Sequence, residues 1–322
     1  MGILDWKDWN GRLPEGEIFL KIDPPLWDSC SLERLEPLTE EYQRQLAGIE
    51  QAARGRQVEF LNTPSAVRDL LDKRRCKERL LRAKLPVTEL LRGSQSDRIR
   101  TAELLIENMR QEKVCQVFIK PVSGSGAAGV SAFRIQPGTG RMSLYTCASA
   151  DADTGLINTK KLRQYTDSRE AADLLDRLLK LDCVIERWYP KASYGGYTYD
   201  LRAVVQEQRV DYILARLSKG PVTNLHLNNH PLPVKELGLP FRILENVEEL
   251  CKRAADCFPG LGSAGIDILL EKGSHNPRII EMNAQGDLIY QDIYQENIIY
   301  RRQAERMKAW LSSAGFSTGG RI

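Results

Sequence analysis

Hydrophobic and polar positions follow two different periods along the chain, which divides it into expected helices and expected strands. Apolar residues recur at helical spacing over residues 38–54, 66–71, 73–83, 96–110, 169–181, 245–258 and 288–311. Short apolar runs bounded by turn residues predict strands at 17–22, 58–61, 87–91, 115–120, 130–135, 142–147, 183–186, 198–206, 210–217, 264–270 and 278–281. Thr39 is the expected N-cap of the first helix, and Gly55 follows its end.

The order of these elements predicts a mixed α+β architecture. Helices dominate the first part of the chain, and antiparallel hairpins interleaved with helices follow, as the turn sequences at residues 137–140 and 207–209 indicate. Strands and helices do not alternate regularly enough for a doubly wound parallel sheet or a barrel. The length of 322 residues suggests two or three lobes rather than one small core.

Composition and charge narrow the classes of function only slightly. The 46 basic and 43 acidic residues give a net charge of +3, so bulk charge favours neither nucleic acid nor a membrane as a partner. The seven cysteines are dispersed without a Cys-x-x-Cys pair, and the three histidines lack a zinc-binding spacing. Because the N-terminus also lacks an apolar run of signal-peptide length, we expect a soluble, cytoplasmic protein with reduced thiols.

One loop carries the first sign of chemistry. An apolar run ends in Lys120, and a loop of Gly, Ser and Ala follows before apolar sequence resumes at Val130. Glycine reaches positive φ, small residues let backbone N–H groups approach an anion, and a lysine adds a positive charge for a phosphate. The lysine precedes the glycines, so the spacing differs from that of a P-loop. The pattern fits either a plain hairpin or a flap over a nucleotide.

Two later strands carry oxygen ligands on one face. Glu281 and Asn283 are two residues apart, so their side chains point to the same side, and Asp267 lies on the expected neighbouring strand. Two carboxylates and an amide oxygen suit Mg²⁺, which keeps its other positions for water and phosphate. The alternative is a pair of ordinary acids at a strand edge.

Two further segments fit a nucleotide site. Residues 186–189, with the sequence Glu-Arg-Trp-Tyr, run from a strand into a loop and could present backbone groups to a base edge. Asp200 and Arg202 share one face of the next strand, and Arg216 lies on the strand that returns beside it. Two arginines beside a metal would stabilise a transferring phosphoryl group or hold a carboxylate. Surface ion pairs are the alternative for each arginine taken singly.

The order of these pieces resembles the ATP-grasp superfamily, and within it the prokaryotic glutathione synthetases and the ribosomal-protein glutamate ligases. The likeness covers about residues 17–295. It rests on the pieces described above, with Lys73 upstream of them, and on three local matches: Lys21-Ile22-Asp23-Pro24-Pro25, Asn62-Thr63-Pro64 and Asn224-Leu225. The chain departs from that pattern in its shorter N-terminal lobe and in residues 223–230, which lack a glycine-rich run.

The resemblance implies two α+β lobes that grip ATP between antiparallel sheets. It divides the chain into a shortened N-terminal lobe at 1–84, a small lobe with the flap at 85–187 and a C-terminal lobe with the metal site at 188–322. It implies ATP contacts for Lys73, Lys120, Ser123, Gly124, Ser125, Gly126, Glu186, Arg187, Trp188, Tyr189 and Asp200. It implies catalytic roles for Arg202 and Arg216, and magnesium ligands at Asp267, Glu281 and Asn283, with two ions expected and Mn²⁺ as a substitute.

The activity implied by the resemblance is that of an ADP-forming ligase. ATP phosphorylates a carboxylate, and an amine then attacks the acyl phosphate to give an amide, ADP and phosphate. The expected partners are small-molecule or peptide acids and amines, with no nucleic acid and no membrane; a homo-oligomer is left open. Two alternatives stay open as well, a small-molecule kinase on the same fold and a nucleotide-binding scaffold without turnover.

Overall fold

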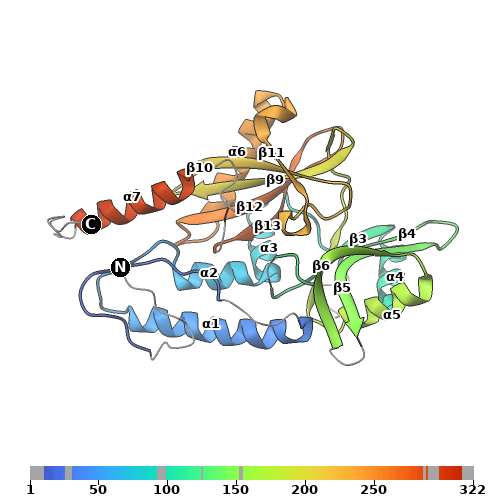
Figure 1. The fold of residues 1–322 in the computed structure, drawn as a ribbon, viewed down its shortest axis with the longest axis horizontal. Coiled ribbons are helices and arrows are strands. Elements are labelled where there is room, and N and C mark those ends of the chain that lie inside the picture. The colour runs from blue at the N-terminus through green and yellow to red at the C-terminus, as the bar shows by residue number, and fades with distance from the viewer. Residues whose placement is uncertain are drawn as a thin grey trace.

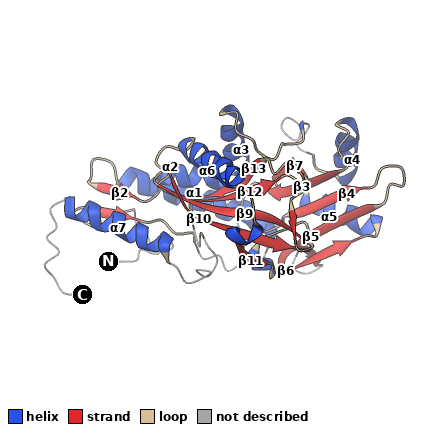
Figure 2. Ribbon diagram, turned by 90° about the horizontal axis from the view of Figure 1, so that it is seen from above, coloured by secondary structure: helices blue, strands red, loops and turns tan. Residues whose placement is uncertain are grey.

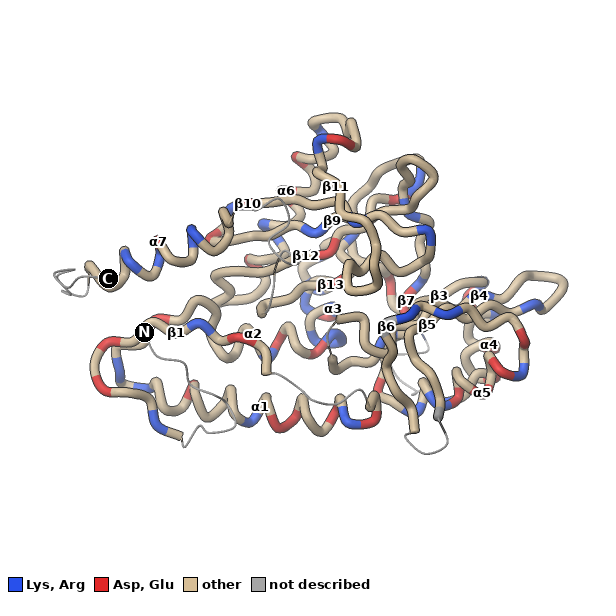
Figure 3. Tube along the Cα trace, viewed as in Figure 1, with Lys and Arg blue, Asp and Glu red and all other residues tan. Residues whose placement is uncertain are grey.

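The computed structural model describes residues 11–25, 31–92, 99–124, 126–151, 155–285, 288 and 297–313. Within these ranges the chain forms two large antiparallel sheets and one small parallel sheet, with helices packed around them (Figure 1). Lysines and arginines, and aspartates and glutamates, are spread along the whole trace (Figure 3). Of the helices that the structure describes, none combines the length and the apolar character needed to span a membrane.

The first large sheet has five strands in the order β6–β5–β4–β3–β7. Its strands are β3 (Gln116–Pro121), β4 (Ser131–Ile135), β5 (Met142–Asp151), β6 (Gly155–Tyr165) and β7 (Cys183–Arg187). Helices α4 (Ala102–Gln111) and α5 (Ser168–Leu178) share a buried core with one face, to which Val117 and Ile119 belong. Because side chains alternate along a strand, Phe118 and Lys120 point to the opposite face.

The second large sheet has six strands, with the order β11–β10–β9–β12–β13 and β8 paired to β9. They are β8 (Ser193–Tyr194), β9 (Tyr197–Gln206), β10 (Arg209–Ser218), β11 (His230–Pro233), β12 (Ser263–Leu270) and β13 (Pro277–Asn283). Helix α6 (Phe241–Asp256) lies beside this sheet (Figure 2) and packs Val247 and Leu250 into a core with Leu201 and Ile266. The alternate residues of β9 and β12 therefore face away from α6.

Helix α1 (Leu35–Ala52) joins the cores of the two large sheets. The 3₁₀ turn η1 (Leu32–Arg34) precedes it, and Leu32 is buried in the core of the first sheet. Tyr42 and Leu46 of α1 are buried in the core of the second sheet. In Figure 1 the helix runs along the lower side of the molecule, beneath α2, with one end beside β5 and β6. The N-terminal segment thus acts as a tie between the sheets.

A buried asparagine fixes the end of the small parallel sheet of β1 (Ile18–Leu20) and β2 (Val58–Phe60). Asn62 Nδ2 donates to the carbonyls of Ser263 at 2.9 Å and Ala284 at 2.6 Å. Its Oδ1 accepts from the amides of Gly262 and Ser263, both at 2.8 Å. All four hydrogen-bonding positions of this amide are filled, so it locks β2 to the ends of β12 and β13.

Two short helices follow Asn62 in the places that the sequence predicts. Thr63 caps α2 (Pro64–Leu71), and Asp72 caps α3 (Lys73–Arg82) with a side-chain oxygen that accepts from a backbone amide. The cap at Asp72 also breaks the two helices apart, so Lys73 begins a new helix close to the glycine loop.

Some expected elements were wrong. Thr39 does not cap a helix, because α1 begins at Leu35 and Thr39 is buried inside it. Residues 87–91 form no named strand, since this segment crosses between the sheets and makes only isolated bridges, from Val87 to Ile279 and from Leu90 to Glu186.

Other elements had different limits from those expected. Strand β6 had no prediction, because its polar sequence lacks an apolar alternation. Helix α4 begins only at Ala102, and residues 93–98 lie outside the described residues. The expected C-terminal helix is α7 (Ile298–Ser313), and residues 289–296 before it also lie outside the described residues.

Candidate functional site

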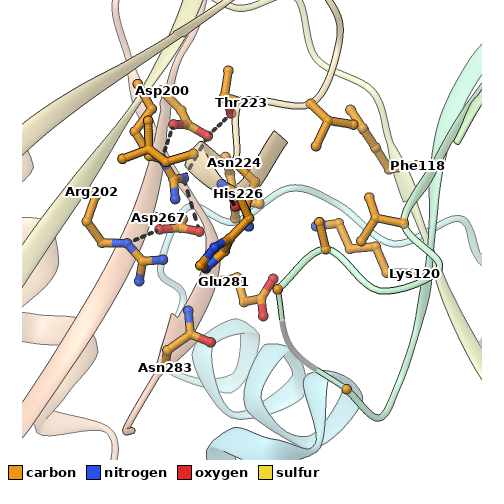
Figure 4. A pocket seen from close by; sticks show the side chains of 18 of the residues that line it. Phe118, Lys120, Asp200, Arg202, Thr223, Asn224, His226, Asp267, Glu281 and Asn283 are labelled. Carbon is orange, nitrogen blue, oxygen red and sulfur yellow. Dashed lines mark hydrogen bonds and ion pairs between the residues drawn. The ribbon is translucent and has the colours of Figure 1, made fainter. Parts of the chain in front are cut away.

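A cavity of about 400 Å³ lies between the two large sheets. Side chains of both sheets line it, and α1 and α2 contribute a largely apolar wall at one end. The residues that matter for chemistry are Thr88, Phe118, Lys120, Glu186, Lys191, Asp200, Arg202, Arg216, Thr223, Asp267, Glu281 and Asn283. Figure 4 shows Lys120 on one side of this space, facing Asp267 and Glu281 on the other.

The second sheet presents its charged residues to the cavity by strand alternation and register. Arg202 of β9 pairs directly with Asp267 of β12, which in turn lies opposite Glu281 of β13. Arg216 of β10 lies opposite Asp200 of β9. The sheet thus brings together residues that are far apart in the chain, as the sequence pattern predicted for Asp267, Glu281 and Asn283.

Arg216 is held on both sides by carboxylates. Its Nε and Nη2 donate to the two oxygens of Asp200 at 2.8 and 3.0 Å, and Nη2 lies 3.1 Å from Oδ2 of Asp267. Burial disfavours the charged guanidinium and by itself would lower the pKa of Arg216. The carboxylates of Asp200 and Asp267 outweigh that effect, so the pKa lies above its usual value. Asp200 also accepts from Thr223 and lies 3.6 Å from Lys191 Nζ. Arg216 and Asp200 therefore both belong to one buried ion-pair network.

Arg202 is held less tightly and keeps free donors. Its Nε lies 3.0 Å from Oδ1 of Asp267, and its two terminal nitrogens have no hydrogen-bond partner among the described residues. A glycine makes room for it, because a Cβ at Gly265 would lie 2.5 Å from Nη1 of Arg202. Burial lowers the pKa of Arg202, and Asp267 opposes that effect. Of the two expected catalytic arginines, Arg202 keeps both terminal nitrogens available, whereas one terminal nitrogen of Arg216 is bound to Asp200 and Asp267.

The oxygen ligands on β12 and β13 fit a divalent cation. Among the described residues, Lys73 is the one cation paired with Glu281, with Nζ 3.9 Å from Oε1, so this carboxylate has only a loose partner there. Oδ1 of Asp267 is buried and receives no hydrogen bond of good geometry, even with Arg202 beside it. Asn283 adds an amide oxygen on the same face as Glu281. Such under-coordinated oxygens are the hard ligands that Mg²⁺ takes.

On the first sheet, Lys120 meets Glu186 at the bottom of the cavity. Lys120 Nζ donates to Oε2 of Glu186 at 2.8 Å, and Thr88 donates to the same oxygen at 2.7 Å. Lys77 Nζ lies 2.7 Å from the other oxygen. Burial would raise the pKa of Glu186, but the two lysines lower it to about 2. The carboxylate therefore stays charged and fully occupied by donors.

The glycine loop after β3 borders the cavity. Gly124, Gly126 and Ala127 line it and all have positive φ, which explains the small residues there. Lys73 Nζ donates to the carbonyl of Gly124 at 2.6 Å and so ties the loop to α3. Ser123 is not part of the cavity wall, and Ser125 lies outside the described residues.

The loop also rests on the N-terminal tie. A Cβ at Gly124 would lie 3.2 Å from a methyl carbon of Leu35, and one at Gly129 would lie 3.4 Å from a methyl carbon of Leu32. The start of α1 therefore packs directly beneath the loop.

Residues 186–189 run along the wall of the cavity. Arg187 and Tyr189 line it, whereas Trp188 does not and packs on Phe118, with ring centroids 5.3 Å apart. The amide of Arg187 donates to Glu89 and that of Trp188 to Gln116, at 2.8 and 3.2 Å. A base edge at this segment would therefore have to meet groups other than these two amides.

Sequence reasoning missed several residues of this site. Thr88 lies in a segment that forms no regular element, so no pattern pointed to it. Lys191 and Thr223 are both buried and bonded to each other at 2.9 Å, next to Asp200. Lys77 had one usable signal, its spacing of four from Lys73 on a predicted helix.

Comparisons with known proteins bear on the fold. No protein-family model matches the sequence, and no curated protein matches it. The crystal structure of D-cycloserine synthetase DcsG superposes with a TM-score of 0.54 and 14% identity, covering 95% of this chain and 87% of that one. The ATP-grasp ligase PsnB complexed with a minimal precursor superposes with a TM-score of 0.51 and 17% identity, covering 86% and 72%.

These superpositions extend over most of the chain. At such low identity they establish the arrangement of the backbone and leave the chemistry to be argued from the side chains. The chain therefore has the ATP-grasp fold.

Proposed function

We propose that this chain is an ATP- and Mg²⁺-dependent carboxylate–amine ligase that forms an amide through an acyl phosphate. The observation that carries the proposal is that one wall of the cavity presents a lysine and the opposite wall presents side-chain oxygens. Lys120 has Glu186 as its one oxygen partner among the described residues, so two of its three N–H donors remain for a ligand. Across the cavity Asp267, Glu281 and Asn283 present oxygens for a cation.

In this proposal the first sheet and the loop bind the nucleotide. Lys120 and the backbone of the glycine loop meet the phosphates, and Lys73 holds the loop against α3. Residues 186–189 pass the base, with Phe118 as an aromatic wall. The proposal also includes the ATP contacts that the sequence predicted for four further residues, Ser123, Ser125, Trp188 and Asp200.

The second sheet would hold the metal and the acid. Asp267, Glu281 and Asn283 would bind Mg²⁺, which when bound neutralises charge on the phosphoryl group in transfer. Arg202 would donate its terminal N–H groups to the substrate carboxylate or to the transferred phosphoryl oxygens. Arg216, committed to Asp200 and Asp267, would keep those two acids charged and in place.

The chemistry needs no side-chain nucleophile. An oxygen of the substrate carboxylate attacks the γ-phosphorus of ATP, and ADP leaves. The amine nitrogen then attacks the carbonyl carbon, and the bond from that carbon to the phosphate oxygen breaks. The amine loses a proton, and phosphate leaves with one oxygen that came from the carboxylate. A water-excluding cavity protects the acyl phosphate from hydrolysis.

The test is substrate-dependent turnover. The protein is incubated with Mg-ATP and a panel of amino acids and dipeptides, while ADP release and product masses are recorded. We expect ADP release that needs both an acid and an amine, and a condensation product lighter than its two precursors by one water.

Matched variants show whether the cavity is responsible. Lys120→Ala should lose at least about a hundredfold in rate, because phosphate stabilisation is lost. Lys308→Ala removes an exposed lysine from α7 and should keep the wild-type rate. A phosphorylated product without any need for an amine would favour the kinase, and tight ATP binding without turnover on any substrate would favour the scaffold.

A further inference from the structure

Lys77 is a buried lysine that the proposed function leaves without a role. It lies on α3 one turn after Lys73, so the two side chains leave the same side of the helix. Lys73 reaches the glycine loop, whereas Lys77 reaches Glu186 behind the cavity. Only 4% of Lys77 is exposed, and it is not part of the cavity wall.

The contacts of Lys77 require its charged form. Its Nζ has three oxygen neighbours, Oε1 of Glu186 at 2.7 Å, the carbonyl of Thr88 at 3.1 Å and Oγ1 of Thr88 at 2.6 Å. The carbonyl can only accept, and the Thr88 hydroxyl gives its proton to Oε2 of Glu186. All three oxygens therefore accept from Lys77, and only an ammonium has three donors.

Two lysines thus share one carboxylate in a buried place. Lys77 occupies Oε1 of Glu186, and Lys120 occupies Oε2 at 2.8 Å. Lys77, Lys120 and Glu186 together carry a net charge of +1, and each is at most 5% exposed. A buried excess charge is costly unless an opposite charge lies beside it. Lys120 borders the cavity, so a bound anion would meet the excess charge there.

We propose that Lys77 is a positioning residue of the nucleotide site, which neutralises Glu186 so that Lys120 keeps its charge for a phosphate. This inference rests on the proposed function, because it takes the anion to be a nucleotide phosphate. Without Lys77, both oxygens of Glu186 are left to Lys120, and the pair becomes neutral. The cavity then offers a phosphate no net charge from this wall, although its shape is unchanged.

The experiment is a comparison of adenosine and ADP binding by isothermal titration calorimetry. Wild type is compared with Lys77→Met, Lys77→Arg and the double variant Lys77→Met/Glu186→Gln, with Lys308→Met as the control for a lysine outside the cavity. Melting curves establish that each variant is folded. Adenosine carries no phosphate, so it reports on the shape of the site without the charge.

We expect Lys77→Met to bind ADP roughly 10- to 100-fold more weakly than wild type, with adenosine affinity within about twofold, since loss of one charge acts on the phosphates alone. The double variant restores the net charge of +1 and should recover the wild-type ratio of ADP to adenosine affinity to within about threefold, because a contact of Glu186 with the base affects both ligands alike. Lys77→Arg keeps the charge and should also bind ADP more tightly than Lys77→Met. The double variant also carries the test if Lys77→Met does not fold.

Three results would overturn the inference. The first is unchanged ADP affinity in Lys77→Met. The second is an equal loss of adenosine and ADP affinity, which a merely structural lysine would give. The third is a double variant whose ratio of ADP to adenosine affinity stays more than about tenfold below that of wild type, because charge balance would then not be the cause. Wild-type protein that binds neither ligand would instead contradict the proposed function itself.

Discussion

The replacement Gly265→Ala separates the stability of this protein from its activity. Gly265 lies in β12, and a Cβ there would lie 2.5 Å from Nη1 of Arg202, whereas ordinary contact begins at 3.4 Å. The guanidinium must therefore retreat by about 0.9 Å. The obstacle is the far end of a flexible side chain, so the free energy of unfolding should change by less than about 1 kcal/mol.

Activity should respond far more strongly. A displacement of about 1 Å in a group that orients a reacting carboxylate costs on the order of a hundredfold in rate. The ion pair between Nε of Arg202 and Asp267, now 3.0 Å, would lengthen as well. The assay is the initial rate of ADP release with a pair of substrates that the panel identifies, together with urea unfolding of the same samples.

The neighbouring residue provides the matched control. Ile266 points into the core beneath α6, and Ile266→Val should lower the free energy of unfolding by about 1 kcal/mol while leaving the rate of ADP release unchanged. If Gly265→Ala kept the wild-type rate, or lost stability in proportion to its rate, the placement of Arg202 at the reacting carboxylate would be refuted.

Three further outcomes follow from the structure. Asn62→Ala leaves two amides and two carbonyls without their buried partner, so urea unfolding should show a loss of about 3–5 kcal/mol, and a loss below about 1 kcal/mol would contradict the tie it forms. The pKa of Glu186 falls from 4.5 to about 2 on folding, so its contribution is complete above pH 4.5 and is lost as the pH drops toward 2. Between pH 4.5 and 2, the free energy of unfolding of Glu186→Gln should therefore fall by up to about 3 kcal/mol less than that of wild type. An equal fall in both proteins would contradict the lowered pKa of Glu186. Removal of Mg²⁺ with a chelator should weaken ATP binding at least about tenfold in wild type and in the surface control Glu305→Gln, but by much less in Glu281→Gln, whereas equal dependence in all three would place the metal elsewhere.

Local patterns were enough to predict which side chains of β13 share a face. The alternation of a strand places Glu281 and Asn283 on one side regardless of the rest of the fold. The observed helix caps at Thr63 and Asp72 are residue types that favour this position, although the cap expected from the sequence was Thr39. The positive φ of Gly124 and Gly126 agrees with the glycine-rich composition of the loop. These features depend on neighbouring residues, so the sequence carries them directly.

Features that depend on distant partners were beyond the sequence. Lys77 meets Glu186 only because α3 packs behind the first sheet, and no spacing in the chain records that contact. The register of β10 on β9 pairs Arg216 with Asp200, a contact between two strands that the sequence does not show. Residues 87–91 have strand propensity, but their place between two sheets allows only isolated bridges.

The central claim is that a carboxylate oxygen takes the γ-phosphoryl group before an amine replaces it. Its most direct test is turnover with an acid substrate labelled with ¹⁸O in its carboxylate, followed by mass analysis of the phosphate and the amide. The account predicts one ¹⁸O atom in each phosphate released, in equal amount to the amide formed. Unlabelled phosphate, or label retained in a phosphorylated acid with no amide, would contradict it.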